Sequence, residues 1–351
     1  MSLPTSSTDT YIPDLNSGSV LFIAAEGFEK RSYYWISKCN TSNIFTNAII
    51  CKYNPKKTSH FEEIFTEIRD RCVNEPKIFE YNTFTPSTFE FILKDHYDEI
   101  YSHNEIVIDI SVMSKLLIVI ILYFLKNFQG KVSIIYSEPV YWSPTEPEFK
   151  IANQNKIDGS YIALSSVGVF DVVRTPMLSS ILMQDSPIIL ITFLSFNEQL
   201  IRVLLNSISP SEVILLNTSY ERYPWRSDAM LEMHMSVLED YMKSNQISEA
   251  GLSRTFSNTD YVKVFEEIAS IYRKECLTKR IILSPTGTKL QAVACSMIKI
   301  CCPDIHIEYP IPESYTFPGF SSDDVFQVHN IRFDNYGNQL LMISNEYNLN
   351  G

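Results

Sequence analysis

The sequence lacks the patterns of several common metal and cofactor sites. Its 6 histidines form no H-x-x-x-H or H-E-x-x-H pair, and its 7 cysteines form no C-x-x-C pair, which argues against zinc. It contains no G-x-G-x-x-G fingerprint and no Walker pattern, which argues against ordinary dinucleotide and P-loop sites. The G-x-S-x-G elbow of many hydrolases is also missing. We therefore predict no metal and no cofactor.

Segments that would take the chain into or across a membrane are also missing. The polar Met1–Ser19 has neither the basic nor the apolar region of a signal peptide. The longest apolar run, Leu116–Leu125, falls short of the roughly 20 residues that span a bilayer, so we expect a buried helix there. The odd number of cysteines favours reduced thiols. These features predict a cytoplasmic protein with no membrane partner.

Positive charge is in deficit. Lys and Arg total 29 against 41 Asp and Glu, which gives a formal charge of −12. A surface of this sign repels the phosphate backbone, so we predict no general DNA or RNA binding. A local basic pocket for a small anion remains compatible with this charge.

What the sequence does contain is an internal repeat. Four apolar blocks recur in the same order: 20–25 and 188–193, 48–51 and 213–216, 105–110 and 280–284, and 132–136 and 305–309. The first, third and fourth pairs are also followed by similar loops. Apolar runs separated by helical stretches are typical of parallel β-α-β units. At roughly 150 residues per domain, 351 residues make two domains. We predict an α/β protein of two tandem Rossmann-like units with parallel sheets, joined by a short extra β segment.

The blocks also suggest boundaries along the chain. We assign 1–18 to a polar tail, 19–144 to the first lobe, 145–186 to a linker with extra strands, and 187–351 to the second lobe. The second lobe includes a predicted C-terminal hairpin whose turn is the Asn-Tyr-Gly-Asn sequence at 335–338.

The first candidate site is the loop that follows the strand at 280–284. In an open parallel sheet, ligands bind beyond the carboxyl ends of the strands. Gly287 permits close approach of backbone, and N–H groups at a helix start favour anions. Lys289 supplies positive charge, and Lys115 opens the matching helix of the first lobe. Thr286 and Thr288 either donate to a phosphate or simply cap the helix.

The second candidate site combines the loop after the first strand with a neighbouring strand end. Its carboxylates are candidates for general acid–base catalysis or for holding ribose hydroxyls, and its arginine for an anion clamp. The alternative is a helix start that attracts acidic residues through its dipole, with the arginine in a surface salt bridge. The residues are Glu26, Glu29, Arg31, Asp109 and Ser111.

The strand, the Thr286-Gly287-Thr288-Lys289 sequence and the apolar helix that follows resemble the glycine-threonine-lysine loop of CARF domains. These are Rossmann-like sensors of cyclic oligonucleotides in prokaryotic defence. The resemblance implies a nucleotide pocket between two paired units. The first lobe departs from the motif, because Asp109-Ile110-Ser111 replaces the Thr-Gly core and only Lys115 matches.

Taken together, these patterns predict a module that senses a small anionic, nucleotide-type ligand, such as a cyclic oligonucleotide in prokaryotic defence. Two alternatives stay open. One is an enzyme that acts on a nucleotide or sugar phosphate through Glu26, Glu29 and Asp109, and the other is a catalytically inert scaffold subunit. A protein partner or a homodimer is compatible with all three.

Overall fold

The chain folds into two α/β units, each built around its own sheet. The computed structural model describes residues 3–8, 13, 18–39, 42–55, 60–155, 166–243, 249–315 and 321–349. Unit 1 comprises Met1–Tyr141 and Ser321–Ile343, and unit 2 comprises Trp142–Phe320 and Ser344–Gly351. The predicted fold class, two Rossmann-like units with largely parallel sheets, is confirmed.

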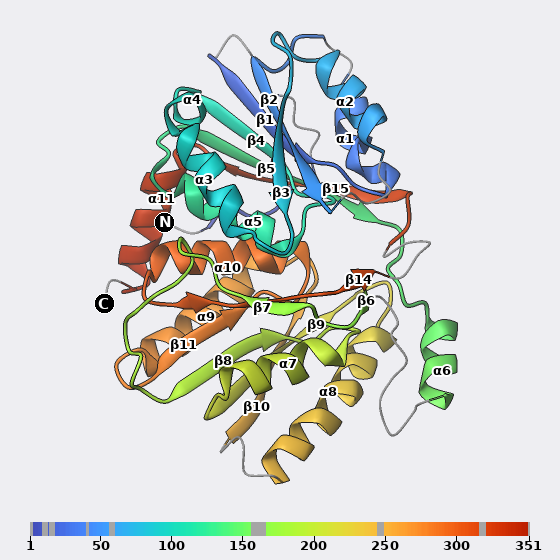
Figure 1. The fold of residues 1–351 in the computed structure, drawn as a ribbon, viewed down its shortest axis with the longest axis vertical. Helices are drawn as coiled ribbons and strands as arrows, with labels where there is room; N and C mark the ends of the chain where they lie inside the picture. The colour runs from blue at the N-terminus through green and yellow to red at the C-terminus, as the bar shows by residue number, and fades with distance from the viewer. Residues whose placement is uncertain are drawn as a thin grey trace. The chain divides into compact units, whose positions relative to one another are not determined.

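The sheet of unit 1 has the order β15-β5-β4-β1-β2-β3 (Figure 1). Strands β1 to β5 are parallel, and β15 pairs antiparallel with β5 at the edge. Strands β1 and β4 are buried along their whole length, as their unbroken apolar sequences suggest. The strands are β1 (Val20–Ala25), β2 (Asn47–Asn54), β3 (Lys77–Asn82), β4 (Glu105–Asp109), β5 (Lys131–Pro139) and β15 (Val325–Phe333).

Helices cover both faces of this sheet (Figure 1). Helices α1 and α2 pack together on one face, and α3 and α5 pack together on the other. The apolar run in α5 is buried as predicted, and no helix of the described residues is long and apolar enough to cross a membrane. The helices are α1 (Tyr34–Ser37), α2 (Phe61–Arg69), α3 (Ser87–Asp95), α4 (Tyr97–Tyr101) and α5 (Lys115–Phe124), with short 3-10 turns η2 (Lys30–Ser32) and η3 (Leu125–Asn127).

The sheet of unit 2 repeats this plan, with the order β10-β9-β8-β11-β12 and every strand parallel. Numbered within each unit, both sheets run 3-2-1-4-5. Lys115 and Lys289 each begin the helix that follows the fourth strand. The elements are β8 (Ile188–Phe193), α7 (Glu198–Ile208), β9 (Glu212–Ser219), α8 (Trp225–Lys243), β10 (Glu249–Ser257), α9 (Tyr261–Glu275), β11 (Arg280–Ser284), α10 (Lys289–Cys301) and β12 (His306–Ile307).

The predicted linker holds a helix and two short strands. Helix α6 (Glu146–Gln154) begins with a capping box, and β6 (Ser166–Val167) and β7 (Asp171–Val173) follow. These strands pair with β14 (Ser314–Tyr315) and β13 (Tyr309–Ile311), so both extra two-stranded sheets belong to unit 2. Residues 160–165, where the extra β segment was also predicted, lie outside the described residues.

The C-terminal region differs from its prediction. Residues 321–343, placed by the sequence in the second lobe, belong to unit 1 through β15. The predicted hairpin is wrong, because its turn begins helix α11 (Tyr336–Glu346). Asn335 Oδ1 accepts from Asn338 N–H at 3.3 Å, and Asn335 N–H donates to Gln339 Oε1 at 3.3 Å. Asparagine favours helix caps as well as turns. Here the segment forms a helix, and its first residue, Tyr336, is buried.

The N-terminal segment, where described, is attached to the edge of the same sheet. Ser7 and Asn330 exchange two backbone hydrogen bonds of 2.8 Å, and Leu3 is buried. Part of the polar tail predicted for 1–18 is therefore attached to the protein, through the Ser7 backbone and the buried Leu3. Apart from residues 3–8, most of this tail lies outside the described residues.

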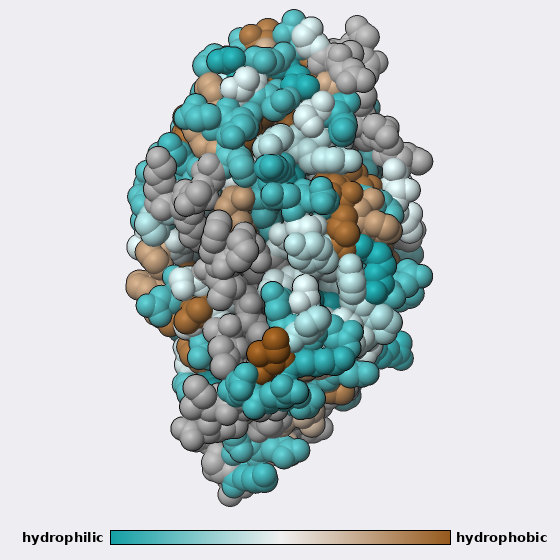
Figure 2. Space-filling view, turned by 90° about the vertical axis from the view of Figure 1, so that its right-hand side faces the viewer, coloured by the Kyte–Doolittle hydropathy of each residue, from teal (hydrophilic) through white to brown (hydrophobic). Residues whose placement is uncertain are grey.

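Apolar side chains fill a core in each unit. One core gathers around Phe22, Trp35 and Phe45 in unit 1, and another packs helices α7 and α8 onto the sheet of unit 2. On the face shown in Figure 2, the hydrophobic residues lie in small separate groups among hydrophilic ones. All 7 cysteines are free, and all but Cys276 are buried.

Candidate functional site

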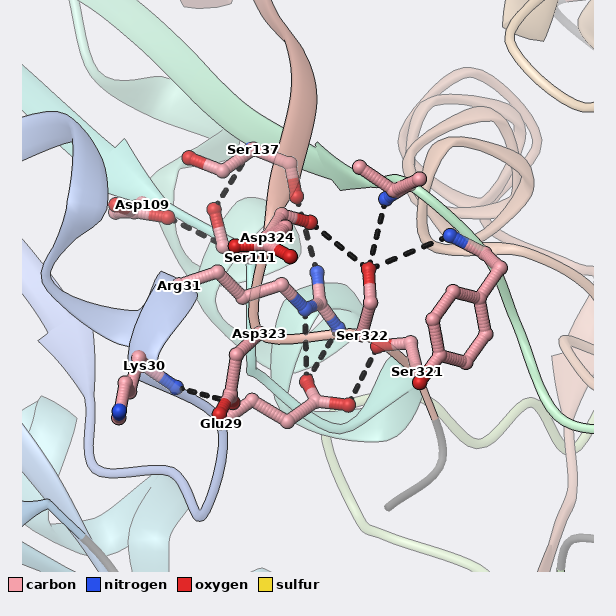
Figure 3. Close-up of polar contacts among 12 residues, drawn as sticks. Glu29, Lys30, Arg31, Asp109, Ser111, Ser137, Ser321, Ser322, Asp323 and Asp324 are labelled. Atoms are coloured by element: carbon pink, nitrogen blue, oxygen red, sulfur yellow. Dashed lines mark hydrogen bonds and ion pairs between the residues drawn. The ribbon is translucent and has the colours of Figure 1, made fainter.

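The carboxyl ends of β1 and β4 form the ligand-binding edge expected for the sheet of unit 1. These adjacent strands are where the strand order reverses, the position at which open α/β sheets bind ligands. Glu26 and Glu29 follow β1, and Asp109 and Ser111 mark the end of β4. The structure thus brings the second set of predicted residues to one edge. Figure 3 shows Glu29, Arg31, Asp109 and Ser111 there.

A buried ion pair occupies this edge. The 3-10 turn η2 places Arg31 against Glu29, with Nη2 2.6 Å and Nε 2.8 Å from Oε2. Arg31 Nη1 also donates to the backbone carbonyl of Ser137 at 3.0 Å, and Ser321 Oγ donates to the other carboxylate oxygen of Glu29. Both charged groups are almost fully buried (Figure 3). The arginine is therefore neutralised within the protein and does not form the surface salt bridge considered above.

Asp109 and Ser111 extend this network across the sheet. Asp109 Oδ1 accepts from the Ser111 N–H at 2.9 Å, and Ser111 Oγ accepts from the Ser137 N–H at 2.8 Å. Ser137 in β5 is thereby bonded on its N–H side by Ser111 and on its carbonyl side by Arg31. The contacts join the ends of β4 and β5 to the turn at residues 29–31. We call these residues, with Ser321, the Arg31 cluster.

A distant segment completes the cluster. Ser322 Oγ accepts from the N–H groups of Val140 and Tyr141 at 2.9 and 3.3 Å. Asp323 Oδ1 accepts from the Lys30 N–H at 2.9 Å (Figure 3). Sequence reasoning missed Ser321, Ser322 and Asp323, because nothing local shows that this segment returns to β5.

Buried Glu26 and half-buried Lys115 also lie at this edge. Glu26 Oε1 accepts from the Tyr53 N–H at 2.7 Å, and the Tyr53 hydroxyl accepts from the Ser114 N–H at 2.7 Å. Burial lowers the pKa of Lys115 to about 8. Each predicted carboxylate of unit 1 accepts at least one hydrogen bond from the protein, an arrangement that stabilises strand ends.

The matching edge of unit 2 lies at the ends of β8 and β11. Thr286 is buried there, and its hydroxyl donates to the Phe193 carbonyl at 2.8 Å and accepts from the Phe193 N–H at 3.0 Å. Its Oγ1 also lies 2.9 Å from Thr192 Oγ1. The Thr286 side chain therefore joins the loop to the end of β8.

Thr288 is the N-cap of α10. Its hydroxyl accepts from the Gln291 N–H at 3.2 Å and donates to the Asn258 carbonyl at 3.1 Å. Gln291 Oε1 accepts from the Thr288 N–H at 2.7 Å, and Gln291 Nε2 donates to Thr218 Oγ1 at 2.8 Å. This capping box was readable from Thr288-x-x-Gln291, and it ties the loop to β9 and to the residue after β10.

Gly287 is required by close packing. A Cβ atom there would lie 2.0 Å from Gln291 Oε1 and 2.8 Å from Phe193 Cγ, both closer than van der Waals contact allows. The Gly287 N–H makes no hydrogen bond within the part of the chain that the structure describes. Half-buried Lys289 follows at the first position of α10. The Gly287 N–H and the Lys289 side chain thus lie at the start of a 13-residue helix.

Two further polar atoms at the carboxyl edge of this sheet are buried without a hydrogen bond to any described residue. They are Oγ of Ser284, the last residue of β11, and Oε2 of Glu308, which follows β12. The Glu308 N–H donates to the Leu283 carbonyl at 3.2 Å, which places it beside the end of β11. The other oxygen of Glu308, Oε1, is ion-paired with Arg174 Nε at 2.9 Å and lies 3.3 Å from His306 Nε2. Buried polar atoms are nearly always satisfied, so the hydroxyl of Ser284 is the atom that points to a water or a ligand.

Comparison with known proteins adds no family. No family model matches the chain, and no curated protein matches it either. Across the described residues, no group of three or more His, Cys, Asp or Glu side chains could hold a metal ion.

Proposed function

We propose that unit 2 binds a small anionic ligand of nucleotide type at the carboxyl edge of its sheet. The observation that carries this proposal is the β11–α10 loop, where the Gly287 N–H has no hydrogen-bond partner among the described residues and Lys289 adds charge. A helix start with an available N–H group favours phosphate or carboxylate. The unsatisfied hydroxyl of Ser284, at the head of the same loop, supports a polar ligand.

The nucleotide class rests on the position and the loop sequence. The ends of the first and fourth strands are where doubly wound sheets take nucleotides. The resemblance of Thr286–Lys289 to the CARF loop makes cyclic oligonucleotides, and a sensing role in prokaryotic defence, the first choice to test. The two threonine hydroxyls are engaged within the protein, so backbone N–H groups and Lys289 would provide the contacts. A sensing role fits the site better than catalysis, since the candidate carboxylates of unit 1 hold strand ends together.

The test is a titration of mono-, di- and cyclic oligonucleotides, followed by calorimetry and thermal shift. A charge-assisted hydrogen bond contributes roughly 1.5–3 kcal/mol, so Lys289→Ala should weaken binding about ten- to a hundred-fold. The matched control is Lys115→Met, which changes the equivalent lysine of unit 1 and should leave affinity unchanged. Equal affinity in wild type and Lys289→Ala would exclude this loop. Absence of binding to every nucleotide would favour the scaffold.

A further inference from the structure

Three side chains of unit 1, from three separate segments, form a chain of hydrogen bonds. Ser6 Oγ lies 3.2 Å from His329 Nδ1, and His329 Nε2 lies 2.7 Å from Glu138 Oε2. Ser6 belongs to the N-terminal segment, His329 to β15 and Glu138 to β5. A hydroxyl, an imidazole and a carboxylate in this order form the arrangement by which proteins activate a serine.

The hydrogen bonds define which nitrogen carries the proton. An ionised Glu138 only accepts, so Nε2 of a neutral His329 is the donor nitrogen. Nδ1 then has a lone pair and accepts from the Ser6 hydroxyl. This is the protonation state that a general base needs in order to take the serine proton.

The imidazole is held in place on its other sides as well. His329 is directly opposite Tyr136 in the β5–β15 register, and the two rings stack with centroids 5.9 Å apart and an interplanar angle of 22°. Ser6 precedes Ser7, whose backbone is bonded to Asn330. Nucleophile and base are therefore positioned by backbone pairing on both sides.

The three hydrogen-bonded side chains differ in burial, as a catalytic arrangement requires: the base and the carboxylate are more buried than the serine. His329 and Glu138 are 6% and 5% exposed, whereas Ser6 is only half-buried. A buried ionisable pair is costly and adds little net stability compared with an apolar pair, so packing alone does not account for it. The oriented base is therefore buried, whereas the serine beside it lies partly at the surface.

We propose that Ser6 is a nucleophile towards small acyl esters, with His329 as its general base and Glu138 as a positioning residue. Ser6 Oγ forms a bond to the carbonyl carbon while its proton passes to His329 Nδ1. The ester C–O bond then breaks, and the leaving alcohol takes that proton. Water hydrolyses the resulting acyl-serine by the same route. This activity belongs to unit 1 and does not depend on ligand binding by unit 2.

The experiment uses the full chain and p-nitrophenyl acetate, with nitrophenol release and peptide mass spectrometry as readouts. We expect one acetyl group on Ser6, lost in Ser6→Ala and unaffected in the matched control Ser7→Ala. General base catalysis contributes about 10²–10⁴-fold, so His329→Gln should slow acetylation by about that factor. Glu138→Gln should slow it less and move its pH profile to lower pH, which a merely structural residue would not do.

One comparison decides the proposal even if the His329 variant unfolds. Ser6→Ala changes only a half-buried hydroxyl, and circular dichroism will show whether its fold is intact. If folded wild type carries no acetyl group on Ser6 and releases nitrophenol no faster than Ser6→Ala, Ser6 is not a nucleophile. The hydrogen bonds would then serve only to attach the N-terminal segment.

Discussion

The loops that lead into the equivalent helices α5 and α10 are held in different ways in the two units. In unit 1 the β4–α5 loop runs into a network in which Asp109 and Tyr53 accept from the loop's own N–H groups, and buried Arg31 is bonded to Ser137. In unit 2 the β11–α10 loop is tied down by a capping box, and the Gly287 N–H has no partner among the described residues.

This difference shows that one topology can serve two purposes at the same edge. Both sheets run 3-2-1-4-5, so both could take a ligand where their strand order reverses. Unit 1 fills that position with its own charged side chains, whereas in unit 2 the Gly287 N–H has no partner among the described residues and Lys289 follows two residues later. Under the proposed function, the repeat would have one binding edge, in unit 2, and one structural edge, in unit 1.

The largest expected effect comes from removing the buried arginine of unit 1. Arg31→Met leaves the Glu29 carboxylate buried without its cation, and breaking such pairs costs about 3–5 kcal/mol of the free energy of unfolding. Urea unfolding of unit 1 can be followed by fluorescence of Trp35, in a background where Trp142 and Trp225 are replaced by Phe.

Lys30→Ala is the control, because the exposed Lys30 side chain is absent from the network and its backbone N–H remains. The double variant Glu29→Gln/Arg31→Met should recover part of the loss, since no buried charge is left unpaired. A cost for Arg31→Met no greater than that for Lys30→Ala would remove the structural role that separates unit 1 from unit 2.

Low pH should lower the free energy of unfolding of unit 2 through one buried histidine. Burial lowers the pKa of His234 in unit 2 to about 4, against about 6.5 for an unfolded histidine. Between these values the unfolded state binds a proton that the native state does not, so stability present above pH 6.5 is lost as pH falls towards 4. The loss reaches about 3 kcal/mol. Urea midpoints of unit 2, read from the fluorescence of Trp142 and Trp225 in a Trp35→Phe background, will measure this loss.

The control for this pH dependence is His234→Gln. This substitution should reduce the change in the free energy of unfolding of unit 2 between pH 6.5 and 4. The pH dependence of unit 1 stability should stay unchanged. If wild type and His234→Gln lose stability in parallel over this range, His234 does not make unit 2 the more acid-sensitive half.

The smallest effect compares the two helix caps. Thr288→Ala should cost about 1–2 kcal/mol, because its hydroxyl both caps α10 and donates to Asn258. Ser114→Ala should cost about 0.5 kcal/mol, because its hydroxyl accepts only a 3.3 Å bond from Leu117 N–H. Chemical unfolding of each variant measures these two losses in the free energy of unfolding. Thr288→Ser keeps the hydroxyl, so its stability should be close to that of wild type. Equal costs at the two caps would contradict the stronger anchoring of the unit 2 loop.

The strands and the repeat could be predicted because each depends on a local run of apolar residues. The start of α10 could also be read from the spacing of Thr288 and Gln291. The Arg31 cluster could not, since Ser321 lies 292 residues from Glu29 along the chain. The assignment of the C-terminal residues to the second lobe failed for a similar reason, because β15 pairs with the distant β5 and its own sequence does not show this partner.

The discontinuity of unit 1 has a consequence for synthesis on the ribosome. Strand β5 ends at Pro139, and the β15 that pairs with it begins only at Val325, after the strands of unit 2 have been translated. During that interval the nascent first sheet has β5 as an open edge, and Arg31 and Glu29 meet without Ser321. The five strands of the unit 2 sheet all lie in the sequence between β5 and β15, so their translation is finished before the last strand of the unit 1 sheet is made.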